Sequence, residues 1–284
     1  MRLGFRPEAE SRKPKAVFRT GQISVAVMLA LAAPAAAQAP VINARVETRA
    51  VAGTLAADIQ ATADRGAAAW VGYRVPMVTR SGRLQFTWTH ATCRLEPSTE
   101  LVVLARVEAK TIVELRAVSV DCDIDAAGMP LVWLGSVNPE QSVAWLSSII
   151  ADVMSGRLGS RLMDPALSAL GQHASPAAGQ ALVALARTGP TTRVRGQALQ
   201  WLARHASAQA GPAIADAIER DPELDVKRRA VMALGQMPRD EGVPLLINVA
   251  RTHKSTEVRR QAMQTLGQTN DPRAVAFFEQ ILLK

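Results

Sequence analysis

The C-terminal half of the chain carries apolar positions that recur every 32 residues. Two columns keep this step through four copies, namely Ala166, Ala198, Ala230 and Ala262, and Leu170, Leu202, Leu234 and Leu266. A second block follows at Leu182, Ile214, Leu246 and Phe278. Within each copy the apolar residues recur every three or four positions, which predicts two amphipathic helices. A helix pair this short cannot bury its apolar face alone, so the copies are expected to stack on one another.

The third and fourth copies show how each unit divides. In the third, a first helix is expected over about 226–236 and a second over about 243–251, because Gly235 and Pro238 separate two runs of helical spacing. The last copy has the bulkiest apolar residues, and these are expected to face inward. They are Phe277, Phe278, Ile281 and Leu282. Its polar residues Glu279, Gln280 and Lys284 predict a polar terminal cap.

The N-terminal half has a different period, close to two. Runs rich in aromatic and β-branched residues at 67–78, 84–89, 100–107 and 111–120 predict strands. Turn residues at 80–83 and 108–110 predict two hairpins. A helix is expected within 46–64, with Leu55 and Ile59 inward. A second helix over about 139–155 begins at the capping residue Asn138. The predicted fold is α+β, with a small antiparallel-sheet domain at 41–155 followed by an α-solenoid at 164–284.

The repeat segments are similar to a known family. "DVKRRAVMALGQMPRDEGVPLLINVA" and "EVRRQAMQTLGQTNDPRAVAFFEQIL" resemble HEAT-like repeats of the short phycobilisome-lyase type. The resemblance covers about 164–284, although the first copy departs from it with Pro165 where a basic residue is expected. It implies an α-solenoid of about four repeats and a protein-binding role, and it does not imply lyase chemistry. The segment "WVGYRVP", followed by the predicted hairpins, a late Cys-Asp pair and the repeats, also resembles exported bacterial HEAT-repeat proteins, which implies no activity.

The first 37 residues read as a secretory signal peptide. A basic stretch precedes the apolar run 23–33, and small residues follow it. Cleavage is expected after Ala37, with Ala39 as the alternative, and the protein is expected to be periplasmic or secreted. The apolar run is shorter than the roughly 20 residues that span a bilayer, so no membrane span is expected after removal of the signal. An uncleaved membrane anchor is the alternative.

Composition and charge change this picture in one respect. The 284 residues carry a formal net charge of +8. Residues 1–37 hold six Lys and Arg and two Asp and Glu, which leaves a net charge of about +4 for the rest of the chain. Half of the basic excess therefore belongs to the export signal, and nucleic acid is not an expected partner.

The chain has two cysteines, Cys93 and Cys122. Outside the cytoplasm two cysteines in one chain favour a disulfide. A loop of this size would add about 3–4 kcal/mol of stability in the chain-entropy model. Two buried free thiols are the alternative.

Candidate chemistry is sparse. Asp121, Asp123 and Asp125 alternate as at the start of a calcium loop, but Ala126 and Val132 stand where an EF-hand needs glycine and glutamate, so a solvated acidic loop is favoured. His173 and His205 stand 32 residues apart and are expected on the surface. No catalytic set involving His90 is evident from the spacing. No enzymatic activity, metal or cofactor is expected.

Two binding surfaces remain. In HEAT-like stacks the second helices line one side, and their non-core columns mix charges and amides, which suits a polypeptide partner. These residues are Arg187, Asp216, Glu219, Asn248, Arg251 and Gln280, and Ile247 is expected to be exposed alongside them. The prediction is an exported interaction module or scaffold that binds a protein partner in the cell envelope. The alternative is cell-wall or small-ligand binding on a platform of Trp70, Trp88 and Trp133 in the predicted sheet.

Overall fold

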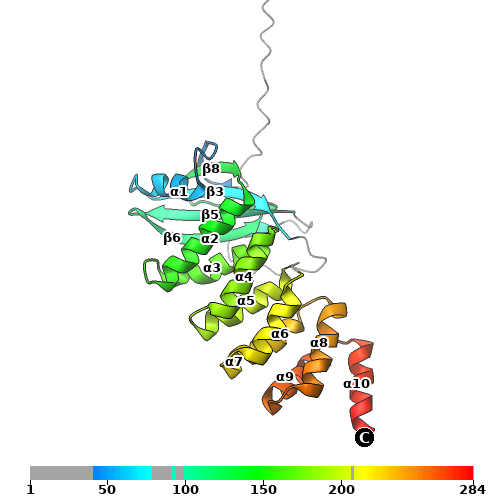
Figure 1. Ribbon diagram of the computed structural model, residues 1–284. Helices are drawn as coiled ribbons and strands as arrows, with labels where there is room; N and C mark the ends of the chain where they lie inside the picture. The colour runs from blue at the N-terminus through cyan, green and yellow to red at the C-terminus, as the bar shows by residue number, and fades with distance from the viewer. Residues whose placement is uncertain (1–40, 79–90, 94–98, 206–207, 284) are drawn as a thin grey trace, which may run out of the picture. The chain divides into compact units, whose positions relative to one another are not determined.

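The computed structural model describes residues 41–78, 91–93, 99–205 and 208–283 (Figure 1). The predicted signal segment 1–37 lies outside these residues, as do the predicted strand 84–89, the turn 80–83, Trp88 and His90. The described part comprises a sheet region near its start and ten α-helices, eight of which follow one another in pairs through the C-terminal half.

The larger sheet has five strands in the order β2-β8-β3-β5-β6. The strands are β2 Arg45–Thr48, β8 Pro130–Ser136, β3 Ala69–Pro76, β5 Glu100–Glu108 and β6 Thr111–Ser119. β5 runs antiparallel to both β3 and β6, whereas β2 and β3 both run parallel to β8. The sheet is therefore mixed, and the prediction of an antiparallel sheet is wrong in this part.

The reason for the parallel pairs lies in helix α1, Leu55–Ala63, which connects β2 to β3. A helical crossover returns the chain to the starting end of the sheet, so both strands run in one direction. β8 then enters between them from much later in the chain. The helix itself begins as expected, because the Thr54 side chain accepts a hydrogen bond from the Ala57 N–H, and Leu55 and Ile59 are buried.

One predicted hairpin is confirmed and the other is not found. β5 and β6 pair antiparallel about a tight turn, where Ala109 and Lys110 both have positive φ, as a two-residue hairpin turn requires. The strand β3 pairs with β5 along Ala69–Pro76 and with β8 along residues 70–74, so both of its edges are occupied between Trp70 and Arg74. The segment that was expected to pair with it, 84–89, lies outside the described residues.

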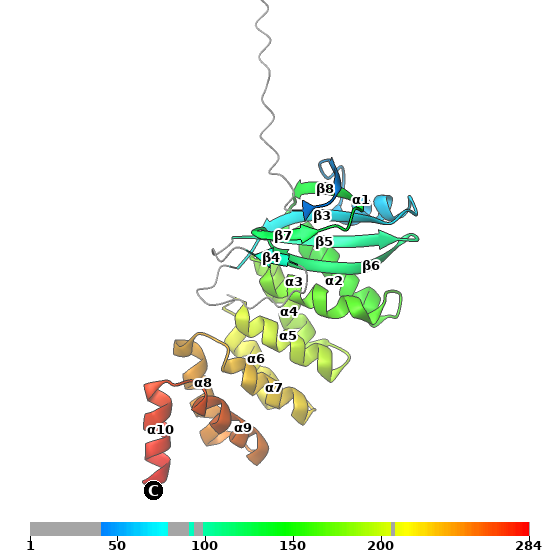
Figure 2. The same cartoon turned by 180° about the vertical axis from the view of Figure 1, so that it is seen from behind.

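A second, three-stranded sheet has the order β1-β7-β4, with β1 Val41–Ile42, β7 Cys122–Asp125 and β4 Ala91–Cys93. Figure 2 shows β7 and β4 in front of the larger sheet, on the face opposite α2. A separate apolar cluster fills the space between the two sheets, and it includes Trp70, Leu104, Leu131 and Trp133. The larger sheet is thus covered on both faces.

The other face of the larger sheet packs against α1 and α2, Pro139–Met154 (Figure 1). Tyr73 on β3 is fully buried here, its hydroxyl lies 3.0 Å from the Ser142 hydroxyl, and its ring meets Trp145 edge-on at 5.9 Å. α2 begins as predicted, because the Asn138 side chain accepts from two backbone N–H groups of the first turn. The Gln141 side chain accepts a hydrogen bond from the Leu55 N–H, which connects α2 to α1.

The C-terminal half consists of four consecutive helix pairs, which confirms the predicted two helices per copy. The first helices are α3 Met163–Gln172, α5 Thr192–Arg204, α7 Leu224–Leu234 and α9 Thr256–Gly267. The second helices are α4 Pro176–Thr188, α6 Ala210–Arg220, α8 Arg239–Thr252 and α10 Pro272–Leu282. First helices pack on the next first helix along the chain, as do α4, α6 and α8.

Small residues let neighbouring helices approach closely. A Cβ built at Gly171 would lie 2.3 Å from the Trp201 ring, and one at Gly235 would lie 2.5 Å from the Thr265 side chain. Both contacts join residues 30 positions apart, and they stand two repeats from each other. The alanines of the 32-residue column are all fully buried, so the predicted core column is confirmed.

The first helix pair is joined directly to the sheet. The Val78 N–H donates to the Gln172 carbonyl at 2.9 Å, and the Ala174 N–H donates to the Pro76 carbonyl at 3.0 Å. The end of β3 therefore pairs with the turn between α3 and α4, and one hydrophobic core runs from the sheet into the repeats.

In the last helix, the expectation that the apolar residues face inward is wrong for Ile281 and Leu282. Phe277 is buried, but Val275, Ile281 and Leu282 are 54, 45 and 84% exposed. The residues 32 positions earlier than Val275 and Ile281, Val243 and Val249, are buried. The last pair thus exposes apolar positions that the repeat before it buries.

Candidate functional site

The column of basic residues on the first helices contacts backbone carbonyls of the preceding helix. The Arg195 side chain donates to the Gly189 carbonyl, Lys227 to the Glu219 carbonyl, and Arg259 to the His253 carbonyl, at 2.6–3.0 Å. These carbonyls lie at the C-terminal ends of α4, α6 and α8. A positive side chain there satisfies carbonyls that have no helical partner and offsets the negative end of the helix dipole.

Arg195 also forms an ion pair. Its guanidinium donates two hydrogen bonds, of 2.8 and 3.2 Å, to the Asp221 carboxylate. The two side chains are only 13 and 5% exposed. The basic column therefore belongs to the framework between repeats and is not a free charged surface.

The histidine column lies inside the protein, so the prediction of surface histidines is wrong. His173 and His205 are 0 and 5% exposed. The His205 Nε2 atom lies 2.9 Å from the His173 carbonyl oxygen, which links the first two repeats. Burial, together with the neighbouring His205, lowers the pKa of His173 to about 4, and burial lowers the pKa of His205. Both rings are therefore neutral near pH 7, and His205 acts as an inter-repeat donor.

Two predicted surface columns on the second helices form a contact that recurs between repeats. The Arg187 guanidinium lies 3.6 Å from the Asp216 carboxylate, and the Arg251 guanidinium donates to the Gln280 amide oxygen at 2.7 Å. Each contact joins residues 29 positions apart, and the two stand two repeats from each other. Arg251 also lies over the Phe277 ring at 5.0 Å. These four polar residues frame the face of the second helices.

The remaining predicted residues differ in accessibility. The two columns together form a polar ladder, with Arg187, Glu219 and Arg251 on one side and Asp216, Asn248 and Gln280 on the other. Glu219 and Asn248 are its middle step, and both are exposed. Among the described residues neither side chain has a hydrogen bond or ion pair, although the Glu219 backbone carbonyl is bound by Lys227. Ile247 is half-buried and packs on the core, so the expectation that it is exposed is wrong. The accessible polar centre of this face is therefore Glu219 and Asn248.

The predicted tryptophan platform is not available as a surface. Trp70 and Trp133 are 2 and 1% exposed and fill the core between the two sheets. Trp88 lies outside the described residues. Arg116 covers Trp70 at 4.6 Å from the ring centre. These two indoles are core residues, and the ligand-binding alternative has no accessible aromatic surface in the described part of the sheet.

The acidic loop contains local hydrogen bonds. Asp121 interacts with the Ser119 hydroxyl at 3.1 Å, and Asp125 accepts from the Ala127 N–H at 2.8 Å. Within the described ranges no group of three or more His, Cys, Asp or Glu side chains is placed to hold a metal ion. No helix of that same part is long and apolar enough to cross a membrane.

The two cysteines stand opposite each other. β4 and β7 pair antiparallel with Cys93 in register with Cys122. Directly opposite residues of such a pair have Cα atoms about 4.5–5.5 Å apart, within the range for a disulfide. Cys122 is buried, and no described cysteine is free.

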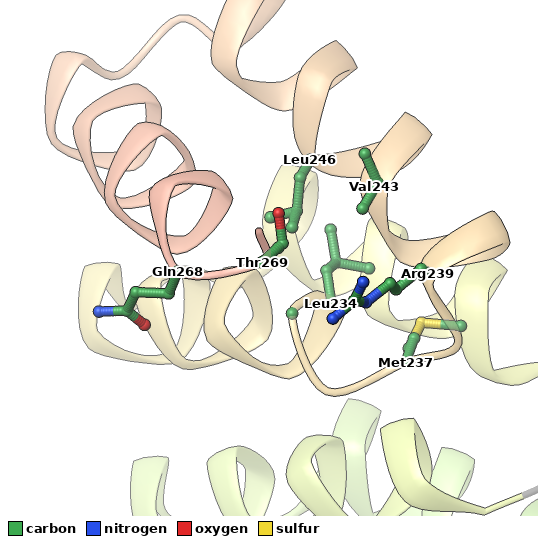
Figure 3. Close-up of a pocket in the computed structure, with 8 residues that line it drawn as sticks. Leu234, Met237, Arg239, Val243, Leu246, Gln268 and Thr269 are labelled. Atoms are coloured by element: carbon green, nitrogen blue, oxygen red, sulfur yellow. The ribbon is translucent and has the colours of Figure 1, made fainter. Parts of the chain in front are cut away.

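A cavity of about 170 Å³ lies between the third and fourth repeats (Figure 3). Its apolar wall is formed by Leu234, Met237, Val243 and Leu246. Arg239 at the start of α8 extends toward Leu234, and Thr269 contributes from the turn between α9 and α10 (Figure 3). Exposed Gly235 and Gln268 complete the lining. The sequence signal for this site was the last step of the histidine column, where Met237 and Thr269 replace histidine.

The comparisons with known proteins support the repeat assignment. The family of HEAT repeats matches residues 211–284, so the C-terminal part of the chain contains HEAT repeats. No curated protein matches the sequence. Among solved structures, the chain is similar to the complex of CpcE and CpcF of phycocyanin lyase from Nostoc sp. PCC7120. The TM-score is 0.37 and the identity 16%, over 50% of this chain and 89% of that chain.

This neighbour corrects one prediction. Because no catalytic set is evident from the spacing, a protein without enzymatic activity was expected. The neighbouring structure is that of a phycocyanin lyase complex, so the expectation that the protein has no enzymatic activity is withdrawn. At this TM-score the similarity assigns no activity to the present chain.

Proposed function

We propose that the protein is an interaction scaffold that binds a polypeptide partner along the second helices of its repeats. The match to HEAT repeats over 211–284 supports a protein-binding role. We also infer that the helix pairs form an α-solenoid, whose second helices present one continuous face. A long face of this kind can follow an extended segment of a partner.

The polar ladder on this face is the observation that carries the proposal. Its two outer steps, Arg187 with Asp216 and Arg251 with Gln280, are closed by contacts within the protein. The middle step, Glu219 and Asn248, is exposed and makes no side-chain contact among the described residues. Fixed side chains on both sides and free ones between them suit hydrogen bonding to a peptide backbone.

A site-specific photocrosslinking experiment tests the proposal. A photoreactive residue at position 248 is expected to trap a discrete partner, because Asn248 lies at the centre of the ladder. The matched control carries the same residue at position 228, since Arg228 is equally exposed but lies on the first helix α7. Adduct from both positions alike, or from neither, would rule out the second-helix face.

A charge-reversing variant gives the second measurement. Glu219→Arg is expected to lower recovery of the trapped partner with little effect on thermal stability, because the side chain is exposed and unpaired. Arg228→Glu, on α7, is the control and should leave recovery unchanged.

We also propose that the chain is exported to the periplasm or beyond and that the partner lies in the cell envelope. The basic, apolar and small-residue order of residues 1–37 supports this. Mass spectrometry of the purified mature protein should find Gln38 as the first residue. A first residue at Met1 on protein from the cytoplasmic fraction would refute export.

A disulfide between Cys93 and Cys122 accompanies this proposal. The register of β4 and β7 and the absence of a free thiol at Cys122 support it. The native protein should take up no alkylating reagent, and two groups should be added after reduction. Removal of the bond should cost about 3–4 kcal/mol of unfolding free energy. Alkylation of both cysteines without reduction would contradict it.

A further inference from the structure

One side-chain column changes size along the repeats, and the cavity lies where it becomes short. The residues of this column lie just after the first helix of each copy and are His173, His205, Met237 and Thr269. His205 reaches back to the carbonyl of His173 and so occupies the space between the first two repeats. The Met237 methyl group lies 3.6 Å from where a Cβ on Gly211 would stand, which places it against the start of α6.

Thr269 has no such reach. Its hydroxyl donates to the Leu266 carbonyl of the preceding helix α9 at 2.7 Å, so this side chain points back to its own repeat. Val243, which stands 32 positions after Gly211, lines the cavity instead of meeting a long side chain. The cavity is therefore the volume that a histidine or methionine would occupy in the preceding repeats.

The size of the cavity restricts what can bind there. Pockets for cofactors and drug-sized ligands have volumes of about 300–1,000 Å³, whereas this one is about 170 Å³. An apolar cavity of about 150 Å³ accepts one benzene molecule. A single aliphatic side chain is of matching size, and the wall of Leu234, Val243 and Leu246 is apolar.

The charge of Arg239 at the rim of the cavity indicates which kind of group would stand next to the bound aliphatic side chain. Arg239 extends along the cavity and has no ion pair within 4 Å among the described residues (Figure 3). The two nearby carboxylates, Asp240 and Asp271, are both held by Arg273, at 3.2 and 2.9 Å, and the charge of Arg239 contributes to the lowered pKa of Asp271 without forming an ion pair with it. Glu241, in the same first turn of α8, is exposed. Arg239 is thus available to a carboxylate brought by a partner.

We propose that this cavity is an anchor site for one aliphatic side chain of a partner polypeptide, with an adjacent carboxylate bound by Arg239. The inference rests on the proposed function, since it names the chemistry of the partner. α8 carries both Arg239 and Asn248, about 13 Å apart along the helix axis and, because nine residues make two and a half turns, on opposite sides of it. A partner segment that reaches both residues has to pass around α8, which takes more than the roughly four or five extended residues that would cover the axial distance alone.

Fluorescence anisotropy with a labelled nonapeptide tests the site on the full chain. The peptide has one central leucine between two aspartates on each side and glycine or serine elsewhere. Saturable binding is expected, and replacing the leucine by alanine should weaken it about tenfold or more. Replacing the aspartates by asparagines should weaken it about threefold or more and remove most of its salt dependence.

The decisive variant fills the cavity as the neighbouring repeats do. Thr269→Met should reduce binding at least tenfold and leave the melting temperature equal or higher, because it adds contacts rather than removing them. Thr269→Ser keeps the hydroxyl and the open cavity, so it should bind as the wild type does. Thr269→His serves as a second filled variant in case the methionine lowers the melting temperature.

The outcomes separate this inference from the proposed function. Absence of binding to the leucine peptide, equal binding of the alanine peptide, or undiminished binding by a filled variant of normal stability would each overturn the anchor site. If position 248 still crosslinks to a partner in the Thr269→Met protein, the scaffold stands and only the anchor site is lost. Loss of the crosslink in that variant alone, with Thr269→Ser unaffected, would support both.

Discussion

The sheet region and the repeats are stabilised by contacts of different range. In the sheet, β8 joins β2 and β3 although more than 50 residues separate it from either, and Tyr73 bonds to Ser142 across 69 positions. In the repeats, the characteristic contacts join residues 29 to 32 positions apart. Long-range pairing makes the sheet region one cooperative unit, whereas a repeat depends mainly on its immediate neighbours.

Core truncation should produce the largest difference between the two regions. Leu104→Ala in the sheet should cost about 2–5 kcal/mol, because Leu104 is 1% exposed in the core between the two sheets. Hydrogen exchange should then speed up in all five strands together. Leu266→Ala, equally buried in α9, should cost a similar amount but expose mainly α9 and α10.

Exchange confined to β5 in Leu104→Ala, or spread over all helices and strands in Leu266→Ala, would contradict the comparison. Leu282→Ala is the control. Truncating a side chain that is 84% exposed should change the unfolding free energy by less than about 0.5 kcal/mol.

The buried histidine of the first repeat should make stability depend on pH. The pKa of His173 is about 4 in the folded protein and near 6.5 when unfolded, so the unfolded state binds more protons between these values. The contribution is complete above pH 6.5 and is lost as the pH falls toward 4, by about 3 kcal/mol. Urea unfolding at pH 7 and pH 4.5 measures the difference.

His173→Asn is the matched variant, because an amide oxygen can accept from the Ser175 N–H as the ring Nδ1 does. The slope of stability against pH should become shallower in this variant. An unchanged slope would show that groups other than His173 cause the whole dependence.

The ion pair between repeats should give a smaller effect. Arg195→Ala should cost about 2 kcal/mol, since it leaves the buried Asp221 carboxylate without its partner and removes a donor to the Gly189 carbonyl. Arg193→Ala removes an exposed pair with Asp164 and should cost less than about 0.5 kcal/mol. Equal losses in thermal unfolding would show that burial does not distinguish the two pairs.

The local features of the fold were predictable from sequence. The 32-residue step gave four helix pairs, the capping residue Asn138 gave the start of α2, and the turn near Lys110 gave the β5–β6 hairpin. Each of these is decided by residues within one repeat or one turn. The parallel strands were missed because strand direction depends on which distant segment enters between β2 and β3, and β8 carries no local sign of that.

The candidate site was predictable only in part. The spacing placed the second-helix columns correctly, but it could not show that Arg187 and Arg251 are used in contacts within the protein. Histidine is polar enough to suggest the surface, and only the neighbouring carbonyl explains why His205 is buried. The change from histidine to methionine to threonine along one column is visible in the sequence. It predicts a cavity at Thr269 only once the structure shows that the longer side chains of this column fill the space between repeats.

The pairing of the end of β3 with the turn between α3 and α4 also has a mechanical consequence. Under tension applied to α10, the helix pairs should detach one after another, since each is held chiefly by its neighbour. The strand that extends into the first turn should resist until β3 itself is pulled from between β5 and β8. A stretching trace should therefore begin with several small, similar steps and finish with a single larger one.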